Sequence, residues 1–242
     1  MTARAPWLIG RTLNGGGGSR RPLPLFSVRR PVRYCILCCL LALCVLPLTG
    51  HAAEPIKLFG TVEFRGELKN MPKWERVVKA EAKSPTFDKD LSQFMTPAFA
   101  KQWTELVARM SGSTTREKAV AVNAFFNRWP YRTDNSLYKI EDYWATPAEF
   151  MKKSGDCEDY AITKFYALIK LGVDPSTMRI VALKDTIRNL GHAVLAVYTE
   201  GDAYILDNLT DMVMTHTRYK QYAPQYSLNQ VYRWAHVVPK KK

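Results

Sequence analysis

The hydrophobic residues in the middle of the chain recur at helical spacing. Between residues 97 and 129 they fall three or four positions apart in two runs, which predicts two amphipathic helices. The first begins at Thr96-Pro97, and the second begins near Thr115. The second helix is expected to end before Pro130, because proline lacks the backbone N–H that a helix interior requires.

Two more helices are predicted before the pattern changes. A short one follows Thr146 and extends to about Lys152, and another begins at residues 154–156 and ends at Gly172. Beyond this glycine, apolar and polar residues alternate, which is typical of half-buried strands. The predicted strands cover residues 179–184, 193–198, 203–206, 212–215 and 231–238.

The remaining segments are less regular. Residues 57–64 predict one or two short strands, residues 72–82 a helix, and residues 131–146 a loop rich in aromatic and acidic side chains. Because most helices precede most strands, the expected fold class is α+β, with the helices packed on an antiparallel sheet.

The composition is that of a globular protein, with 47% hydrophobic and 24% charged residues. A formal charge of +13 raises the question of nucleic-acid binding. The excess is concentrated at the N-terminus, because residues 1–53 contain seven arginines and no acidic residue. The rest of the chain has 28 basic and 22 acidic residues, so no nucleic-acid partner is expected.

The N-terminal 53 residues have the layout of a secretory signal peptide. Arginines at positions 29, 30 and 33 precede an uncharged apolar run over residues 34–48, and Ala52 and Ala53 supply small residues for cleavage. The run is short for a membrane span, which needs roughly 20 residues. Cleavage near Ala52 or Ala53 is expected, with an uncleaved inner-membrane anchor as the alternative. Export of the rest of the chain is expected in either case.

Cysteine usage singles out one residue. Four of the five cysteines (Cys35, Cys38, Cys39 and Cys44) belong to the apolar leader, which leaves Cys157 alone in the exported part. It has no intrachain disulfide partner there. Cys157 follows Gly155-Asp156 at a predicted helix start, where free backbone N–H groups and the helix dipole favour a thiolate. A nucleophilic thiol is one interpretation, and an inert buried cysteine is the other.

A candidate base and its orienting acid come from a predicted hairpin. Glu200-Gly201 forms the turn, so His192 lies opposite Leu209 and diagonal to Asp207, on the same face of the sheet. An aspartate in that position can accept a hydrogen bond from the imidazole. A register slip of one residue would move Asp207 to the opposite face, and the alternative role for Asp207 is to end the strand.

Three acids surround the candidate nucleophile. Asp156, Glu158 and Asp159 lie beside Cys157 in sequence, and their charges disfavour a thiolate. They suit the first turn of a helix, where carboxylates cap N–H groups and complement the dipole. The alternative is a calcium site, because calcium prefers several oxygen ligands and its charge would offset the repulsion.

Five motifs in order resemble one known family. The sequence is similar to the bacterial transglutaminase-like cysteine proteinases over roughly residues 95–237, and within them to periplasmic proteases that clip the N-terminal region of a large biofilm adhesin. The matching motifs are Asp142-Tyr143-Trp144-Ala145-Thr146-Pro147, Gly155-Asp156-Cys157-Glu158-Asp159-Tyr160-Ala161, His192-Ala193-Val194-Leu195, Leu206-Asp207-Asn208-Leu209 and Tyr226-Ser227-Leu228-Asn229.

The resemblance implies a fold and a set of domains. The fold would be papain/transglutaminase-like, with the catalytic cysteine at the start of a helix that packs on an antiparallel sheet. Residues 1–53 would be the signal peptide or anchor, residues 54–94 an N-terminal extension, and residues 95–242 the proteinase domain.

The resemblance also implies roles for the candidate site. Cys157 would be the nucleophile, His192 the general base and Asp207 its orienting partner. Asp156, Glu158 and Asp159 match the motif associated with Ca²⁺ in this family. The expected substrate is a large repeat adhesin, and the expected sequestering partner is an inner-membrane receptor that senses cyclic di-GMP.

Two other functions remain open from the sequence. The same three residues would serve a transglutaminase or an amidase, in which an amine or another acceptor replaces water. A non-catalytic exported binding domain would keep the fold and use the loop at residues 131–146 for a partner. The presence of a complete Cys157, His192 and Asp207 set argues against the binding domain.

Overall fold

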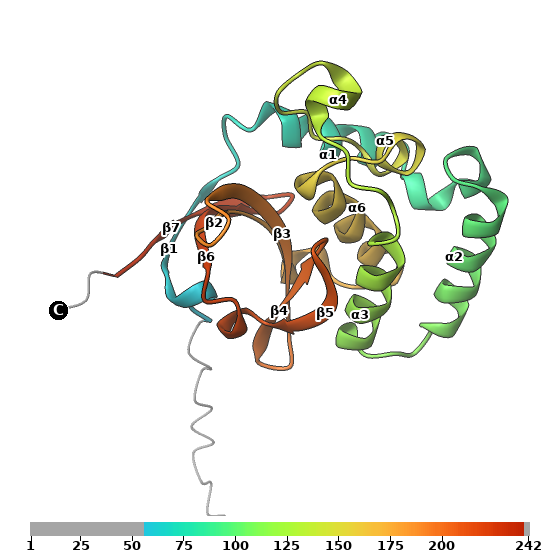
Figure 1. Ribbon diagram of the computed structural model, residues 1–242. Helices are drawn as coiled ribbons and strands as arrows, with labels where there is room; N and C mark the ends of the chain where they lie inside the picture. The colour runs from blue at the N-terminus through green and yellow to red at the C-terminus, as the bar shows by residue number, and fades with distance from the viewer. Residues whose placement is uncertain (1–55, 240–242) are drawn as a thin grey trace, which may run out of the picture. The chain divides into compact units, whose positions relative to one another are not determined.

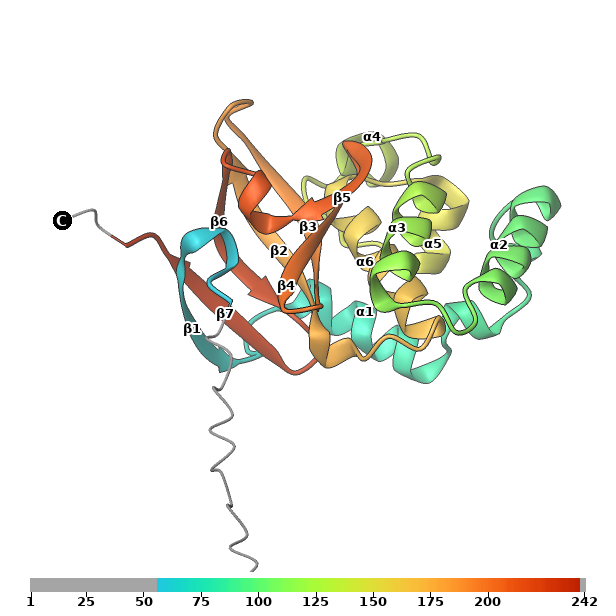
Figure 2. The ribbon, with the colours of Figure 1, turned by 90° about the horizontal axis from the view of Figure 1, so that it is seen from below.

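The computed structural model describes residues 56–239, which form one antiparallel sheet covered by helices. Figure 1 shows that the sheet curls strongly, and Figure 2 shows most helices on one side of it. The strand order is β1-β7-β6-β2-β3-β4-β5. The strands are β1 (Val62–Glu67), β2 (Met178–Asp185), β3 (Leu190–Thr199), β4 (Asp202–Asp207), β5 (Thr210–Thr215), β6 (Tyr222–Leu228) and β7 (Tyr232–Val237). The α+β prediction is confirmed.

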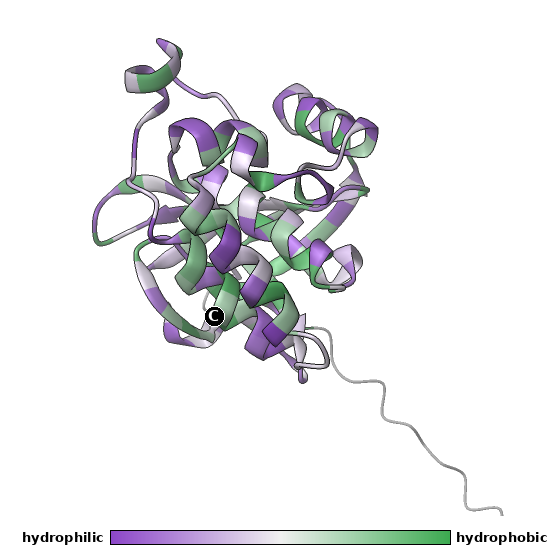
Figure 3. Cartoon of the chain, turned by 90° about the vertical axis from the view of Figure 1, so that its right-hand side faces the viewer, coloured by the Kyte–Doolittle hydropathy of each residue, from purple (hydrophilic) through white to green (hydrophobic). Residues whose placement is uncertain are grey.

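The helices begin where their capping residues predict. Thr96, Thr114 and Thr146 each accept a hydrogen bond from a backbone N–H in the first turn of their helix. Figure 3 shows polar and apolar residues mixed along these helices, as expected for elements with one buried face. The helices are α1 (Pro72–Lys83), α2 (Pro97–Arg109), α3 (Thr115–Phe126), α4 (Asp134–Tyr138), α5 (Pro147–Lys153) and α6 (Cys157–Lys170).

Helix α6 is the central helix of the described part. Ten of its residues are buried, and it packs against α3, α5 and strands β2, β3 and β4. Its apolar side chains join a core with residues from the other helices and from one face of the sheet, including Trp74, Phe126, Phe150, Phe165 and Leu195. Cys157, the first residue of α6, is therefore held at a fixed place beside β3.

The opposite face of the sheet has its own smaller core. Val194 and Ala196 of β3 and Ile205 of β4 belong to it, together with the rings of Tyr219 and Tyr222. Because side chains alternate along a strand, His192 shares the face of Val194, and Asp207 shares the face of Ile205. The two candidates on the sheet thus lie on this second face, His192 near the start of β3 and Asp207 at the end of β4.

The predicted hairpin register is correct. Leu195 pairs with Leu206, and Thr199 pairs with Asp202, across a turn at Glu200-Gly201. Both turn residues have positive φ, 53° and 75°, which is the geometry of a two-residue turn that matches the twist of the strands. This register fixes Asp207 on the face of His192.

Three segments differ from the sequence-based prediction. The segment over residues 57–64 begins with a 3₁₀ turn at Leu58–Gly60, and only then enters β1. The loop over residues 131–146 contains the short helix α4. Strand β6 was not predicted, because Pro224 interrupts its pattern; the β2–β6 ladder shifts register beside this proline, which has no N–H to donate.

The predicted leader lies outside the described residues. Within residues 56–239, none of the helices is both long and apolar enough to span a bilayer.

Candidate active site

A tight turn places the candidate nucleophile. Helix α5 ends at Lys153, and Ser154 then takes a positive φ of 69° before Gly155 and Asp156 lead into α6. A Cβ on Gly155 would lie 2.1 Å from Oδ2 of Asp159, so only glycine fits. Asp159 fastens the turn, because its carboxylate accepts hydrogen bonds from the N–H groups of Asp156 (3.2 Å) and Ala145 (2.6 Å).

The thiol of Cys157 is surrounded by acids. Its Sγ donates a hydrogen bond to Oε2 of Glu158 at 3.2 Å. Burial raises the pKa of the thiol well above its usual value, and the carboxylates of Glu158 and Asp156 raise it further. The backbone N–H of Ala193 in β3 donates toward the sulfur and acts in the opposite direction. The helix start alone therefore does not produce a thiolate, contrary to the simplest expectation from the dipole.

His192 and Asp207 form a buried pair. Nε2 of His192 lies 2.9 Å from Oδ1 of Asp207, and the two residues are 6% and 1% exposed. The N–H of Leu209 donates to the same oxygen at 3.0 Å. Burial opposes ionisation of Asp207, but these hydrogen bonds and the imidazole hold its pKa below the usual value. The carboxylate is thus an ionised acceptor that fixes the orientation of the ring.

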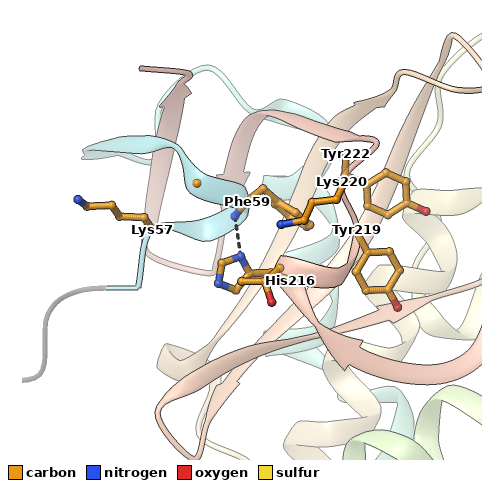
Figure 4. Close-up of a pocket in the computed structure, with 8 residues that line it drawn as sticks. Lys57, Phe59, His216, Tyr219, Lys220 and Tyr222 are labelled. Carbon is orange, nitrogen blue, oxygen red and sulfur yellow. Dashed lines mark hydrogen bonds between the residues drawn. The ribbon is translucent and has the colours of Figure 1, made fainter. Parts of the chain in front are cut away.

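A third group on this carboxylate, Tyr222, was not predicted from the sequence. Its hydroxyl donates a hydrogen bond to Oδ2 of Asp207 at 2.5 Å. Its ring stacks on Tyr219, with centroids 5.2 Å apart and an interplanar angle of 11°. Both rings line an open pocket together with Phe59 and His216 (Figure 4). Tyr222 therefore restrains Asp207 from β6, a strand that the sequence pattern did not predict.

The described residues show no hydrogen bond between Cys157 and His192. The sulfur is turned toward Glu158, while Ala193, the neighbour of His192 along β3, contacts it through the backbone. Because Asp207 occupies Nε2, Nδ1 is the ring nitrogen left to exchange a proton with the thiol. Catalytic hydrogen bonds are often long before substrate binds. The structure thus brings two members of the predicted triad together and leaves the thiol beside them.

Replacement of Tyr222 by phenylalanine should lower kcat about 5-fold to 20-fold with little change in KM. The variant leaves Oδ2 of the buried Asp207 without its donor, and an unpaired buried acceptor costs about 1–3 kcal/mol. The matched control is Tyr219→Phe, because the Tyr219 hydroxyl makes only a long hydrogen bond (3.4 Å) to the carbonyl of Met212. Equal kcat values for the two variants would show that Tyr222 does not position Asp207.

Three carboxylates, two of them buried and one half-buried, lie close together beside the thiol. Oxygens of Asp134, Asp156 and Asp159 lie within 4.8 Å of one another. One oxygen each of Asp134 and Asp156 is buried and has no hydrogen-bond partner. Burial raises the pKa of Asp134 to about 6 and that of Asp156 to about 8, and burial also raises the pKa of Asp159. Ca²⁺ binds oxygen ligands at 2.3–2.6 Å, so the spacing and the unpaired oxygens fit this ion.

Two members of this group, Asp156 and Asp159, were predicted as metal ligands from the sequence, and the third, Asp134, was not. Asp156 and Asp159 belong to it, whereas Glu158 belongs to two neighbouring groups, one with Asp156 and Cys157 and one with Asp134 and Asp142. From the sequence, Asp134 was only one of several acids in the loop predicted over residues 131–146. It begins α4, and its other oxygen accepts a hydrogen bond from the N–H of Tyr143 at 2.5 Å. The available indication was that three adjacent residues offer too few ligands for Ca²⁺.

The other two histidines of the described part serve the fold. Nδ1 of His216 accepts a hydrogen bond from the N–H of Phe59 at 2.9 Å, which holds the 3₁₀ turn before β1 (Figure 4). His236 lies between the hydroxyls of Thr61 and Ser227, at 2.8 and 2.9 Å. Of the three histidines in the described residues, His192 is therefore the candidate for a catalytic role.

The antiparallel sheet, packed against a helix that begins with a cysteine, defines the class of the fold, which is transglutaminase-like. The family model of the bacterial transglutaminase-like cysteine proteinases matches residues 100–242. No curated protein sequence gives a match. The chain belongs to the bacterial transglutaminase-like cysteine proteinase family, as its motifs predicted, and is a cysteine protease by that membership.

Solved structures of one protein, LapG from Legionella pneumophila, are similar to this chain. One is 28% identical, with a TM-score of 0.52, and the match covers 66% of this chain and 86% of that chain. A calcium-bound structure is 30% identical, with a TM-score of 0.51 and coverage of 64% and 83%. An EGTA-treated structure is 28% identical, with a TM-score of 0.50 and coverage of 64% and 81%.

Proposed function

We propose that this protein is a calcium-dependent periplasmic endopeptidase that uses Cys157, His192 and Asp207 to cleave the N-terminal region of a large cell-surface adhesin. The observation that carries the proposal is the 2.9 Å hydrogen bond between His192 and Asp207, next to the strand residue whose N–H meets the Cys157 sulfur. A binding domain would have no use for a buried, oriented imidazole beside a free thiol.

The mechanism follows from the residue types. The thiol of Cys157 passes its proton to Nδ1 of His192, and the sulfur attacks the carbonyl carbon of the substrate peptide bond. Asp207 stabilises the resulting imidazolium through Nε2. The N–H of Cys157, free at the helix start, donates to the developing oxyanion. His192 then protonates the leaving amine, and it later activates the water that hydrolyses the thioester.

Rotation of the Cys157 side chain is the movement that this mechanism needs. Its sulfur now donates to Glu158, and a turn about the Cα–Cβ bond redirects it. The neighbouring N–H of Ala193 keeps a hydrogen-bond donor beside the sulfur, which favours the thiolate form.

Asp134, Asp156 and Asp159 are the residues that would hold Ca²⁺, with Glu158 at its edge. When bound, the ion supplies positive charge that pairs with the carboxylates and lowers the pKa of the adjacent thiol. The two unpaired buried oxygens support this assignment from the chain itself, and the calcium-bound LapG structure supports it by similarity. The carboxylate of Asp159 also fixes the turn that presents Cys157.

The substrate, location and partner rest on the likeness to the adhesin proteases. The arginine-flanked apolar segment at residues 29–48 supports export to the periplasm. There the protease would meet the N-terminal region of a large repeat adhesin, and an inner-membrane, LapD-like receptor of cyclic di-GMP would sequester it. Cleavage would release the adhesin from the cell surface.

The test is incubation of the protein with the purified N-terminal region of a large repeat adhesin from the same organism. The expected result is a single cut with the unsubstituted chain and none with Cys157→Ala. The products are weighed with and without an added primary amine. Free carboxyl ends in both cases support hydrolysis, whereas amine incorporation at most of the cut ends would identify an acyl transferase. An intact adhesin with both proteins would contradict the proposal.

A further inference from the structure

A buried lysine lies in the middle of the helix that begins with Cys157. Lys164 follows Cys157 by two helical turns, and it is 1% exposed. Burial lowers the pKa of its amine to about 7. Burying an amine is unfavourable unless its N–H groups find hydrogen-bond acceptors. The acceptors that Lys164 contacts therefore indicate its role.

Two asparagines accept hydrogen bonds from this amine, Asn123 in the last turns of α3 and Asn127, the residue that follows its end. Nζ of Lys164 lies 2.8 Å from Oδ1 of Asn123 and 2.6 Å from Oδ1 of Asn127. The asparagines are four residues apart, so they lie one above the other on the same face of the helix end. Because both side-chain Oδ1 atoms accept from the lysine, both side-chain Nδ2 groups point away from α6.

The amide groups of the asparagines hold the turn that carries Asp207. Nδ2 of Asn123 lies 2.8 Å from the carbonyl oxygen of Thr210. Nδ2 of Asn127 lies 2.9 Å from the same oxygen and 3.0 Å from the carbonyl oxygen of Asp207. These two carbonyls belong to the paired residues at either end of the β4–β5 turn. The turn is thus fixed from α3 by its backbone.

We propose that Lys164, Asn123 and Asn127 form a positioning device that sets the carboxylate of Asp207 relative to the helix bearing Cys157. The chain of contacts runs from α6 through α3 to the β4–β5 turn, and it joins the elements that carry the sulfur and the acid. The assignment deepens the proposed function, because Asp207 matters for catalysis through His192.

Packing alone does not account for a lysine at this place. An apolar side chain of similar length would fill the space without burying an amine, and such replacements are often neutral or stabilising. What an apolar residue does not do is hold two amide groups in one orientation. Without the lysine, the asparagines are free to flip or to turn, and the β4–β5 turn loses its tether.

The first experiment measures the turn directly, in the full-length protein and without substrate. The N–H of Leu209 donates to Oδ1 of Asp207, so its hydrogen exchange reports how firmly the acid is held. Lys164→Met and Asn127→Ala should each accelerate exchange at Leu209 about tenfold relative to amides of β2. The control is Ile162→Val, a change at a fully buried residue of the same helix whose side chain has no polar atom to bond either asparagine. Unchanged exchange at Leu209 in both variants would overturn the assignment.

The second experiment measures the consequence for the thiol. Alkylation by iodoacetamide is followed by mass spectrometry on the peptide that contains Cys157. Lys164→Met should slow it roughly 10-fold, and the same change in an Asp207→Ala background should have less than about a twofold effect, since no acid remains to position. Equal slowing in both backgrounds would mean that Lys164 acts on the helix in general, and would overturn the assignment.

The two experiments separate this inference from the proposed function. If Cys157 in the unsubstituted protein reacts no faster than glutathione, the proposed protease mechanism fails. The exchange result at Leu209 still decides whether Lys164 and the asparagines fix the turn. Asn127→Ala serves where Lys164→Met does not fold, because it removes the direct contact with the carbonyl of Asp207.

Discussion

Replacement of His192 by alanine should lower kcat/KM for adhesin cleavage by about 10³-fold or more. In the proposed mechanism Nδ1 of this ring takes the thiol proton, and a base is needed because burial and the neighbouring carboxylates raise the pKa of Cys157 above its usual value. Loss of the imidazole removes the base for attack and the acid for the leaving amine together. Single removals from such triads leave only the contribution of substrate binding and the oxyanion donors.

The matched control for this variant is His216→Ala. His216 is a buried histidine too, at 7% exposure, but its hydrogen bond holds the N–H of Phe59 rather than a carboxylate beside the thiol. The control should lower stability and leave kcat within about twofold. Steady-state cleavage rates and denaturant unfolding of both variants are compared. If His192→Ala keeps more than a tenth of the normal kcat/KM, His192 is not the base.

The register of the β3–β4 hairpin shows why part of the site was predictable. A two-residue turn at Glu200-Gly201 fixes the pairing of every later residue, so the contact between His192 and Asp207 follows from counting. The start of α6 was equally local, because a glycine and an acid precede Cys157 and mark a helix N-terminus. Both predictions depend on neighbours within about 15 residues of sequence.

The partners that hold these residues were not predictable in the same way. Tyr222 of β6 and Asn127, which follows α3, contact Asp207, and Lys164 of α6 contacts Asn127. These contacts span separations along the chain that no local pattern records. Asn127 and Lys164 have polar side chains at helix positions, where solvent exposure is the ordinary expectation. Only the packing of α3 between α6 and the β4–β5 turn gives them their roles.

Asp134 illustrates the same limit for the proposed metal site. It precedes Asp156 by more than twenty residues, and the turn into α6 brings the two carboxylates together. A parallel bridge between Tyr131 and Gly155, and the hydrogen bond from Arg132 N–H to the Gly155 carbonyl, align the two segments. The sequence predicted which acids adjoin the thiol, and the fold added one from a distant segment.

Removal of calcium with EGTA should suppress cleavage more than tenfold and lower Tm by about 5–10 °C. A ligand present at 100 times its Kd stabilises the folded state by about 2.7 kcal/mol. For a domain of this size each kcal/mol shifts Tm by about 2–4 °C. Without the ion, Asp134 and Asp156 face each other as buried carboxylates whose raised pKa values, about 6 and about 8, reflect the cost of their charge. Scanning calorimetry in excess Ca²⁺ and in EGTA measures the shift.

The ligand assignment is tested by Asp134→Asn, with Glu105→Gln as the control. Asparagine keeps the size of the side chain but removes the charge of an oxygen that is buried and unpaired, whereas Glu105 is exposed on α2, far along the chain from the cluster. Asp134→Asn should weaken Ca²⁺ binding about tenfold or more in a titration followed by Tm, because charge count sets the affinity of oxygen sites. The control should bind as the unsubstituted chain does. Equal Tm values in Ca²⁺ and EGTA for the unsubstituted chain would return Asp156 and Asp159 to the role of helix caps, and the thiol would need another source of positive charge.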